Sequence, residues 1–197
     1  MTVIGITGPT GSGKTTALKV LKKRGFEIVD CDRLYDSLVD TDEKLRESLR
    51  NAFGEVFLAD GKLDRRGLAQ KVFGSKTELD KLNAIVFPVV YAAVAAKIEK
   101  STQKGIAIDA INLVECKLGQ LCDVTVAVTA DASVRLKRIM ARDGIDEERA
   151  KARIAAQKPD KFYRKNCNFF LENRAGSAAE FERLMDDFMD NILFMEE

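Results

Sequence analysis

Residues 8–16 read GPTGSGKTT and follow a short apolar stretch, TVIGIT, at residues 2–7. The stretch fits the pattern G-x-x-x-x-G-K-[ST] through Gly8, Gly13, Lys14 and Thr15. Glycines let the backbone approach a ligand closely, and successive N–H groups in such a loop form a binding site for anions. Residues 2–7 predict a buried strand, and residues 15–23 predict a helix whose N-terminal end adds positive charge. We therefore expect a loop that holds the phosphates of a nucleoside triphosphate.

The side chains of this loop have distinct expected tasks. Lys14 can reach the β- and γ-phosphates as a mobile charge, and the hydroxyl of Thr15 can bind Mg²⁺. ATP is therefore the expected co-substrate and Mg²⁺ the expected metal ion. The residues expected to bind ATP are Gly8, Gly11, Ser12, Gly13, Lys14, Thr15 and Thr16.

The composition is that of an ordinary globular chain. It has 197 residues, of which 46% are hydrophobic and 32% charged, and its formal net charge is +1. This charge indicates neither a nucleic-acid nor a membrane partner. No uninterrupted apolar run reaches the roughly 18 residues of a membrane span. The N-terminus has no secretion signal, so we expect a cytoplasmic protein, whose oligomeric state the sequence does not indicate.

The chain contains no histidine, which limits its chemistry. A Cys/His zinc site is excluded, and the spacing of the four cysteines does not favour a four-cysteine site. We expect four reduced thiols, at Cys31, Cys116, Cys122 and Cys167. A general base must be a carboxylate or, less favourably, a Lys, Tyr or Cys.

Strand and helix patterns alternate along most of the chain, which predicts a parallel α/β sheet. After the first strand, short apolar runs predict strands at 26–29, 106–109, 124–128 and 169–171. Further helices are predicted from 131 or 133 to about 142, at 146–157 and at 179–195. Residues 33–104 have helical spacing throughout and form an expected insertion, in which Pro88 opens or kinks the helix at 89–100.

Several acidic side chains follow predicted strands. Asp30 and Asp32 follow the second strand, Asp109 ends the third, and Glu115 lies six residues further on. Ligands of open α/β sheets bind at the carboxyl ends of the strands, so these carboxylates are candidates to accept a proton or to contact the acceptor. The alternative for each aspartate is a structural role in a turn or as a helix cap.

Three arginines, Arg135, Arg138 and Arg142, share one face of a predicted helix. Such a stripe is usually solvated, but phosphoryl transfer develops negative charge that arginines neutralise. Residues from about 140 to 165 can form a lid that carries arginines and excludes water. Arg65 and Arg66, in the insertion, can bind an anionic acceptor or lie exposed.

The chain resembles the dephospho-coenzyme A kinase family, a nucleoside monophosphate kinase-like branch of the P-loop kinases. The resemblance runs through GPTGSGKTT, FEIVDCDRLYDSLV, DGKLDRRGLAQKVF, LNAIVFPVV, DAINLVE, RLKRIMARDG, RIAAQ and NFFLEN. It implies a Rossmann-like, three-layer P-loop NTPase core at 1–32 and 105–197, a helical lid at about 140–165, and an acceptor-binding helical insertion at 33–104.

The resemblance also implies an activity and roles for individual residues. The activity is the ATP-dependent phosphorylation of the ribose 3′-hydroxyl of dephospho-coenzyme A, which gives coenzyme A and ADP. Asp32 is implied as the base or hydroxyl-orienting group, and Arg138 and Arg142 lie near the phosphates and the base of ATP. With Lys14 these form the expected catalytic set, while Asp32, Arg65, Asp109 and Glu115 are the expected acceptor contacts.

The chain departs from the family pattern at three places. Phe87-Pro88 stands for His-Pro, Ile111-Asn112-Leu113 for a Pro-Leu-Leu type run, and Arg135 for a glutamine. The first two departures concern the acceptor side. They leave open a kinase of the same fold with another nucleotide-like acceptor, or an inactive ATP-binding relative. A GTPase is disfavoured, because no N-K-x-D tetrapeptide occurs.

Overall fold

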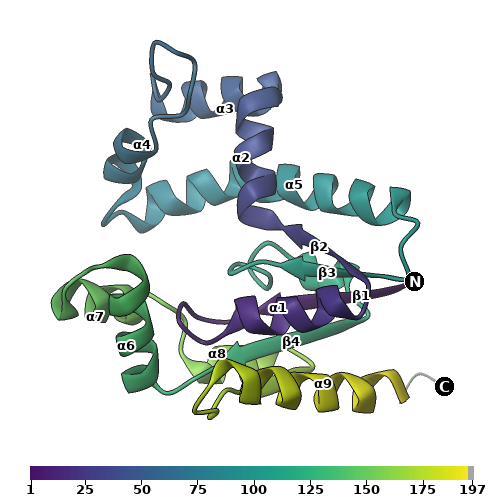
Figure 1. Ribbon diagram of the computed structural model, residues 1–197. Coiled ribbons are helices and arrows are strands. Elements are labelled where there is room, and N and C mark those ends of the chain that lie inside the picture. The colour runs from purple at the N-terminus through teal and green to yellow at the C-terminus, as the bar shows by residue number, and fades with distance from the viewer. Residues whose placement is uncertain (195–197) are drawn as a thin grey trace. The chain divides into compact units, whose positions relative to one another are not determined.

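The computed structural model describes residues 1–194, and its centre is a five-stranded sheet with the order β2-β3-β1-β4-β5 (Figure 1). Strand β1 pairs in parallel with β3 and β4, and β4 pairs in parallel with β5. The strands are β1 (Thr2–Thr7), β2 (Phe26–Asp30), β3 (Gly105–Asp109), β4 (Val124–Thr129) and β5 (Phe169–Glu172). All five were predicted within one residue at each end, and the predicted parallel α/β fold is confirmed.

The chain divides into two compact units. The sheet unit contains Met1–Val29 and the chain from Ser101 onward, and the helical unit is Asp30–Lys100. The helices of the sheet unit are α1 (Lys14–Lys23), η1 (Leu118–Leu121, a 3₁₀ helix), α6 (Ala132–Asp143), α7 (Glu147–Ala155), α8 (Asp160–Asn166) and α9 (Ala178–Phe194). Helix α9 confirms the predicted last helix as far as Phe194. The expected final residue of that helix, 195, lies outside the described residues.

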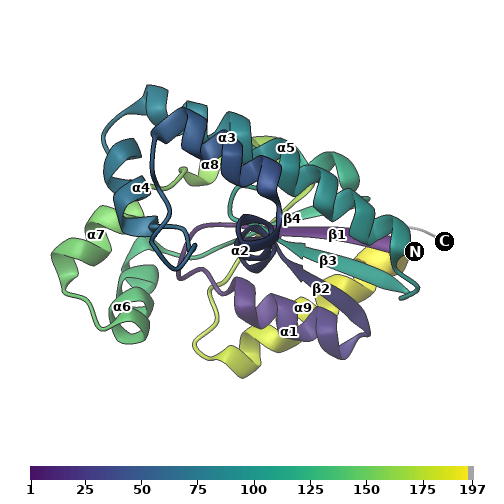
Figure 2. The same ribbon diagram turned by 90° about the horizontal axis from the view of Figure 1, so that it is seen from above.

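Helices α1 and α9 cover one face of the sheet, as Figure 2 shows. Ile4 and Ile6 alternate along β1 onto this face and pack in one cluster with Leu21 of α1 and Phe181 of α9. Residues between them point to the opposite face, because successive strand residues alternate. There Gly5 has no room for a side chain, since a Cβ would lie 2.8 Å from Cys122 Sγ. The strand is buried on both faces, which explains its continuous apolar sequence.

The helical unit contains α2 (Cys31–Thr41), α3 (Glu43–Phe53), α4 (Arg65–Val72) and α5 (Lys76–Lys100). The side chains of Asp30, Asp42 and Asp64 accept hydrogen bonds from the first backbone N–H groups of α2, α3 and α4. Such caps satisfy donors that a helix leaves unpaired at its start. The unit has its own apolar cluster, which includes Leu45, Leu49 and Phe53 of α3. The helical unit thus has capped helices and a hydrophobic core of its own, as a compact unit needs.

Helix α5 differs from the sequence prediction, because it is continuous and contains Pro88 in its interior. Of the two alternatives expected for Pro88, that it opens or that it kinks a helix, the first was wrong, because α5 already begins at Lys76. A proline at this position removes one N–H donor to the carbonyl of Ala84, and Ala84 is exposed, so water can satisfy that carbonyl.

Judged by length and composition alone, helix α5 is also long and apolar enough to cross a membrane, with a mean hydropathy of 1.5 over its most apolar 18 residues. Among the described residues it is the only helix that meets this test. The observation is weak evidence for a span. Leu82, Ile85, Val86 and Val89 of α5 pack against the core of the helical unit.

Candidate active site

The loop between β1 and α1 has a backbone that its glycines make possible. Gly8 and Gly13 have φ angles of 132° and 113°, in the region where residues with a side chain are strained. Space is also lacking: a Cβ on Gly8 would lie 2.0 Å from the carbonyl oxygen of Val128, and a Cβ on Gly13 2.5 Å from Asn173 Nδ2. The loop therefore lies directly on β4 and on the end of β5. Both glycines are needed for the conformation and for this close packing.

The mouth of the loop is electrically positive. Lys14 donates from Nζ to the carbonyl oxygen of Gly8 at 2.7 Å, so its ammonium group lies over the loop. Helix α1 begins at Lys14, has no acidic residue in its first turn, and directs the positive end of its dipole toward the loop. Thr15 is exposed in this first turn. This combination suits the binding of phosphate groups.

A buried amide supports the loop from below. Asn173 follows β5, is 4% exposed, and donates from Nδ2 to the carbonyl oxygen of Ser12 at 2.8 Å. Its backbone N–H donates to the carbonyl oxygen of Thr129 at 2.7 Å, and its Oδ1 accepts from the N–H of Ala175. Ser12 itself is completely buried. Asn173 thus joins the loop to the ends of two strands.

Helix α6 supports the loop from the side with two arginines. Arg138 donates from Nη1 to the carbonyl oxygens of Gly11 and Ser12, at 3.2 and 3.3 Å. Arg135 is only 6% exposed and donates from Nε to the carbonyl oxygen of Thr10 at 2.9 Å. A fully solvated arginine stripe is therefore the wrong interpretation for the first two members. Arg135, which the sequence offered as a member of the stripe and as a departure from the family pattern, is one of the main contacts of the loop.

The third arginine of the stripe is placed differently. Arg142 is exposed and makes two hydrogen bonds to the carboxylate of its neighbour Asp143, at 2.7 and 3.0 Å. Arg153 of α7 donates to the same carboxylate. The two guanidinium groups lower the pKa of Asp143, with the hydrogen bond from Arg142 as the largest cause. The contacts link the end of α6 to α7.

Two further acidic candidates lie in the sheet unit. Asp109 pairs in register with Ile6, so it ends β3 at the same edge of the sheet from which the loop departs. Glu115 is half-buried. Its Oε1 lies 3.8 Å from Nζ of Lys158, which belongs to the connection between α7 and α8. The charge of Glu115 contributes to raising the pKa of Tyr163 to about 12, after the larger effect of burial. Glu115 is thus placed against the predicted lid segment.

Burial raises the pKa of three of the four thiols. Burial, followed by the charge of Glu115, raises the pKa of Cys116 to about 11. Burial is also the first cause that raises the pKa of Cys122 to about 12 and that raises the pKa of Cys167. No disulfide joins the cysteines, all four of which lie in the described part of the chain. The expectation of reduced thiols is consistent with this arrangement.

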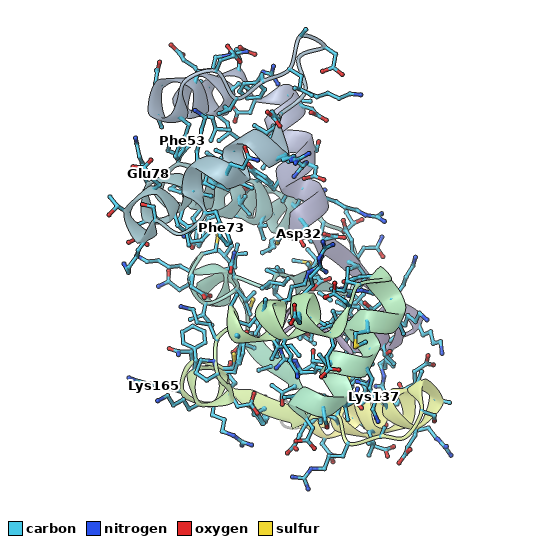
Figure 3. The ribbon with its side chains drawn as sticks, turned by 90° about the vertical axis from the view of Figure 1, so that its left-hand side faces the viewer. Asp32, Phe53, Phe73, Glu78, Lys137 and Lys165 are labelled. Carbon is cyan, nitrogen blue, oxygen red and sulfur yellow. The ribbon has the colours of Figure 1, made fainter. Side chains whose placement is uncertain are left out.

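In the helical unit, the two aspartates after β2 have different positions. Asp30 accepts hydrogen bonds at 3.0 Å from the N–H groups of Asp32 and Arg33, so it is the cap of α2. This is the structural alternative that the sequence left open for Asp30. Asp32 lies in the first turn of α2 with an exposed side chain (Figure 3). Its carboxylate is therefore at the surface of the unit, where a ligand can reach it.

Arg65, the first residue of α4, contacts Asp36, which lies one helical turn after Asp32 in α2. Its Nη2 is 2.5 Å from Asp36 Oδ1, and its guanidinium carbon is 6.0 Å from the centre of the Tyr35 ring. Asp32 and Asp36 are four residues apart in α2 and so share a face. Arg65 and Asp32 are thereby brought onto one face of the helical unit, and both are exposed.

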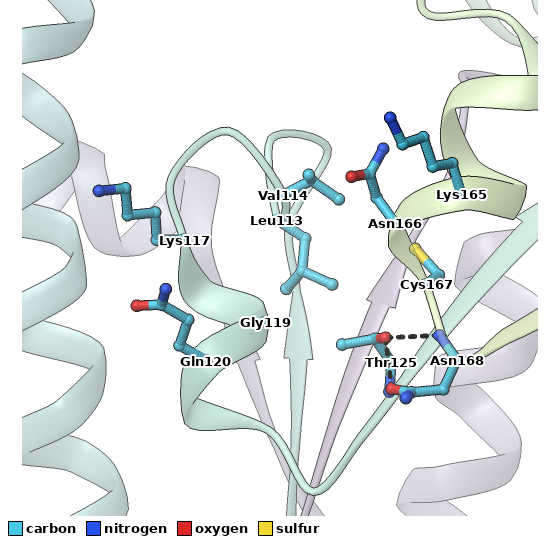
Figure 4. A pocket seen from close by; sticks show the side chains of 10 residues that line it. All are labelled: Leu113, Val114, Lys117, Gly119, Gln120, Thr125, Lys165, Asn166, Cys167 and Asn168. Atoms are coloured by element: carbon cyan, nitrogen blue, oxygen red, sulfur yellow. Dashed lines mark hydrogen bonds between the residues drawn. The ribbon is translucent and has the colours of Figure 1, made fainter.

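A separate pocket of about 500 Å³ lies in the sheet unit, far along β4 and β5 from the loop (Figure 4). Thr125 and Asn168, which line it, stand at the amino ends of β4 and β5, whereas the loop meets the carboxyl ends. Asn168 Oδ1 already accepts hydrogen bonds from the N–H and hydroxyl of Thr125. This pocket is therefore not part of the candidate active site.

Sequence reasoning missed two contributors to the loop, Gln157 and Asn173. Gln157 Oε1 accepts from the N–H of Thr10 at 3.2 Å and also from Arg135. Gln157 and Asn173 stood inside the quoted motifs RIAAQ and NFFLEN, without a role. A signal was present: both are amides placed just after an element of the sheet unit, a common place for side chains that bind backbone groups.

Comparison with known proteins gives a consistent result for almost the whole chain. The sequence profile of the dephospho-CoA kinase family matches residues 2–179. The dephospho-CoA kinase of Corynebacterium glutamicum is 35% identical over 196 residues, which cover 96% of this chain and 98% of the relative. That of Carboxydothermus hydrogenoformans is 33% identical over 187 residues, covering 93% and 91%.

Solved structures agree in fold. TT1252 from Thermus thermophilus superposes with a TM-score of 0.78 at 31% identity, covering 98% of this chain and 96% of its own. The dephospho-CoA kinase from Campylobacter jejuni has a TM-score of 0.59 at 21% identity, covering 96% of each chain. A shikimate kinase from Acinetobacter baumannii, at 16% identity and a TM-score of 0.55, covers 98% of this chain and 93% of its own. The last two likenesses concern the fold alone, which is that of the P-loop kinases.

Proposed function

Because the chain belongs to the dephospho-coenzyme A kinase family, and so uses ATP to phosphorylate dephospho-coenzyme A, we propose how its residues divide that reaction. The sheet unit binds ATP and the helical unit binds the acceptor. Gly8, Gly11, Ser12, Gly13, Lys14, Thr15 and Thr16 hold the phosphates. The observation that carries the proposal is the loop itself, whose outer carbonyls are held by Arg135, Arg138 and Asn173, and whose mouth carries the Lys14 ammonium group.

The outward carbonyls have a direct chemical consequence. A side chain behind the loop that binds a C=O fixes the orientation of that peptide group, and this holds the loop in a shape whose backbone N–H groups can bind an anion. Phosphoryl transfer depends on positioning and on electrostatic stabilisation more than on covalent chemistry of the protein. A loop that is already held in shape therefore supplies much of what the reaction needs from the ATP side.

We further propose Mg²⁺ as the metal ion of the reaction. The exposed hydroxyl of Thr15 at the start of α1 is its protein ligand. No cluster of three or more potential ligands among His, Cys, Asp and Glu occurs in the described residues. This donor set fits Mg²⁺, which keeps several waters and is bound mainly through substrate phosphates. When bound, the ion neutralises charge on the β- and γ-phosphate oxygens.

On the acceptor side, Asp32 orients the ribose 3′-hydroxyl and accepts its proton as the oxygen bonds to the γ-phosphorus of ATP. The bond from that phosphorus to the β-phosphate oxygen breaks, and ADP leaves. Arg65, on the same face of the helical unit, binds an anionic group of the acceptor. Asp109 and Glu115 contribute acceptor contacts from the sheet unit. Because the chain has no histidine, a carboxylate is the favoured proton acceptor, and the exposed side chain of Asp32 supports this role.

The arginines of α6 complete the proposal. Arg138 lies against the loop and so is close to the phosphates that the loop binds. Arg142 exchanges its contact with Asp143 for the nucleotide when the segment of residues 140–165 closes as a lid. Closure of a lid excludes water and so prevents hydrolysis of ATP. Small-molecule substrates are the proposed partners, without nucleic acid or membrane, and the proposed location is the cytoplasm.

The test is an assay of ADP release with ATP and Mg²⁺, in which dephospho-coenzyme A is compared with AMP, adenosine and no acceptor. We expect ADP release that depends on dephospho-coenzyme A, with coenzyme A identified by mass. Release that depends on AMP or adenosine instead would identify a kinase with another acceptor. ATP binding without acceptor-dependent release would identify an inactive relative, and both results would refute the acceptor proposed here.

A further inference from the structure

The backbone of Thr10 is held on both sides by side chains from outside the loop. Its C=O accepts from Arg135 Nε at 2.9 Å, and its N–H donates to Gln157 Oε1 at 3.2 Å. Arg135 also donates from Nη2 to the same Gln157 oxygen. The three residues thus form a closed ring of hydrogen bonds that fixes both peptide groups next to Thr10.

The members of this ring come from three separate elements. Thr10 belongs to the loop, Arg135 to α6, and Gln157 to the connection between α7 and α8. The guanidinium is buried, and burial is the largest cause that lowers the pKa of Arg135, partly opposed by the charge of Asp160. A buried cation is retained only where its hydrogen bonds are well made, because its desolvation is costly.

We propose that Arg135 and Gln157 are positioning residues. They hold the backbone N–H and C=O of Thr10 in the conformation that receives ATP, and they connect the phosphate loop to the segment after α7. The inference rests on the proposed binding of ATP by the loop and extends it to two residues outside the phosphate-loop motif. The effect passes through Thr10, so neither residue needs to touch the nucleotide.

The geometry requires a guanidinium group at position 135. Its Nε and Nη2 point in two fixed directions at once, one to the Thr10 carbonyl and one to the Gln157 oxygen. A lysine offers a single mobile ammonium group with no such fork. Both neighbours of Gln157 Oε1 are donors, so the amide oxygen, and not its nitrogen, must face the ring.

The connection also explains why the position of the α7–α8 segment matters to the loop. Gln157 contacts Thr10, and the next residue, Lys158, lies 3.8 Å from Glu115 Oε1. Two consecutive side chains therefore attach this segment to the phosphate loop and to the chain after β3. A movement of the segment changes the hydrogen bonds at Thr10, so lid position and loop shape are coupled.

The experiment compares Arg135→Ala, Arg135→Lys, Gln157→Ala and the double variant Arg135→Ala/Gln157→Ala with a matched control. The control is Arg149→Ala, because Arg149 is an exposed arginine of α7 whose ion pair is with Asp146. Hydrogen exchange of the amides at residues 8–16 is measured without nucleotide. ATP affinity is measured by calorimetry, and KM for ATP, KM for the acceptor and kcat are measured separately.

We expect Arg135→Ala to accelerate loop exchange and to weaken ATP binding about 10-fold, the effect of losing a hydrogen bond to a charged group. The KM for the acceptor and kcat at saturating ATP should stay within about threefold, because the loop and not the reacting atoms is altered. Arg135→Lys should resemble Arg135→Ala. The double variant should lose less affinity than the product of the two single losses, because the ring is shared.

Three results would overturn the proposal: loop exchange in Arg135→Ala equal to that of Arg149→Ala, full rescue by lysine, or independent effects of the two substitutions. If Arg135→Ala does not fold, Gln157→Ala, which keeps the guanidinium, decides the question by the same readouts. If the unaltered protein does not bind ATP, the proposed function fails. The exchange measurement, made without nucleotide, still decides whether the ring holds the loop.

Discussion

The phosphate loop and the acceptor face of α2 are built by opposite means. The loop is held by buried side chains, with Arg135 and Asn173 at 6% and 4% exposure, that bind its backbone. The proposed acceptor face of the helical unit offers exposed charged side chains, Asp32 of α2 and Arg65 of α4, and the ion pair between Arg65 and Asp36 lies at the surface. A phosphate site needs a fixed backbone, whereas a site for a long substrate can use side chains that adjust. The comparison implies that changes at the loop should affect stability and ATP, and changes on α2 the acceptor.

The largest effect is expected from Lys14→Ala, which removes the charge over the loop. Turnover should fall below detection, because no other ammonium group lies on the Gly8 carbonyl to meet the β- and γ-phosphates. ADP release is the measurement. Lys19→Ala, an exposed lysine of the same helix, is the control and should keep normal turnover. An unchanged kcat in Lys14→Ala would remove Lys14 from the mechanism.

On the acceptor face, Asp32→Asn should lower kcat by about 10²- to 10⁴-fold, the usual contribution of a positioned base. ATP affinity, measured by calorimetry, should be kept, since Asp32 belongs to the helical unit. Asp40→Asn, an exposed aspartate later in α2, is the matched control. Loss of ATP binding in Asp32→Asn would show that this carboxylate helps to bind the nucleotide and its metal ion. That result would contradict the proposal that the helical unit binds only the acceptor.

Beneath the loop, Asn173→Ala should lower the free energy of unfolding by about 2 kcal/mol, because the buried Ser12 carbonyl loses its amide donor. For a chain of this size that corresponds to a Tm lower by roughly 6 °C. ATP affinity should fall with it. Asn166→Ala is the control, because Asn166 is exposed and its side chain donates to the carbonyl oxygen of Phe162 within its own helix. Equal melting temperatures for the two variants would contradict the supporting role of Asn173.

The smallest effect should follow Arg65→Ala, with KM for dephospho-coenzyme A raised about 10-fold and kcat little changed, as for a contact made equally in ground and transition states. The Tm should hardly move, because exposed ion pairs contribute at most about 1 kcal/mol. Arg66→Ala, its exposed neighbour in α4, is the comparison in the same assay. If the two variants raised KM equally, Arg65 would have no specific contact with the acceptor.

The parts of the molecule that depend on local pattern could be predicted from sequence. The strands and the phosphate loop follow from short apolar runs and from glycine spacing, and both are where the sequence placed them. The spacing of Arg135, Arg138 and Arg142 correctly predicted a shared helix face. It could not predict which members of that face are buried, because burial depends on where α6 packs against the loop.

The contacts that the sequence did not predict join residues that are far apart in the chain. Gln157 and Thr10 are 147 residues apart, and Asn173 and Ser12 are 161 apart, so no local pattern connects them. Pro88 is the opposite case, in which a strong local signal was overridden. Val86 and Val89, on either side of Pro88, pack against the core of the helical unit. This packing keeps α5 continuous.

The buried thiols have a consequence for an enzyme whose product is itself a thiol. Exchange with the disulfide form of coenzyme A requires a protein thiolate. Burial raises the pKa of Cys116 to about 11 and that of Cys122 to about 12, so both thiols stay protonated near neutral pH. Burial thus withdraws these two thiols from exchange with the disulfide form of the product.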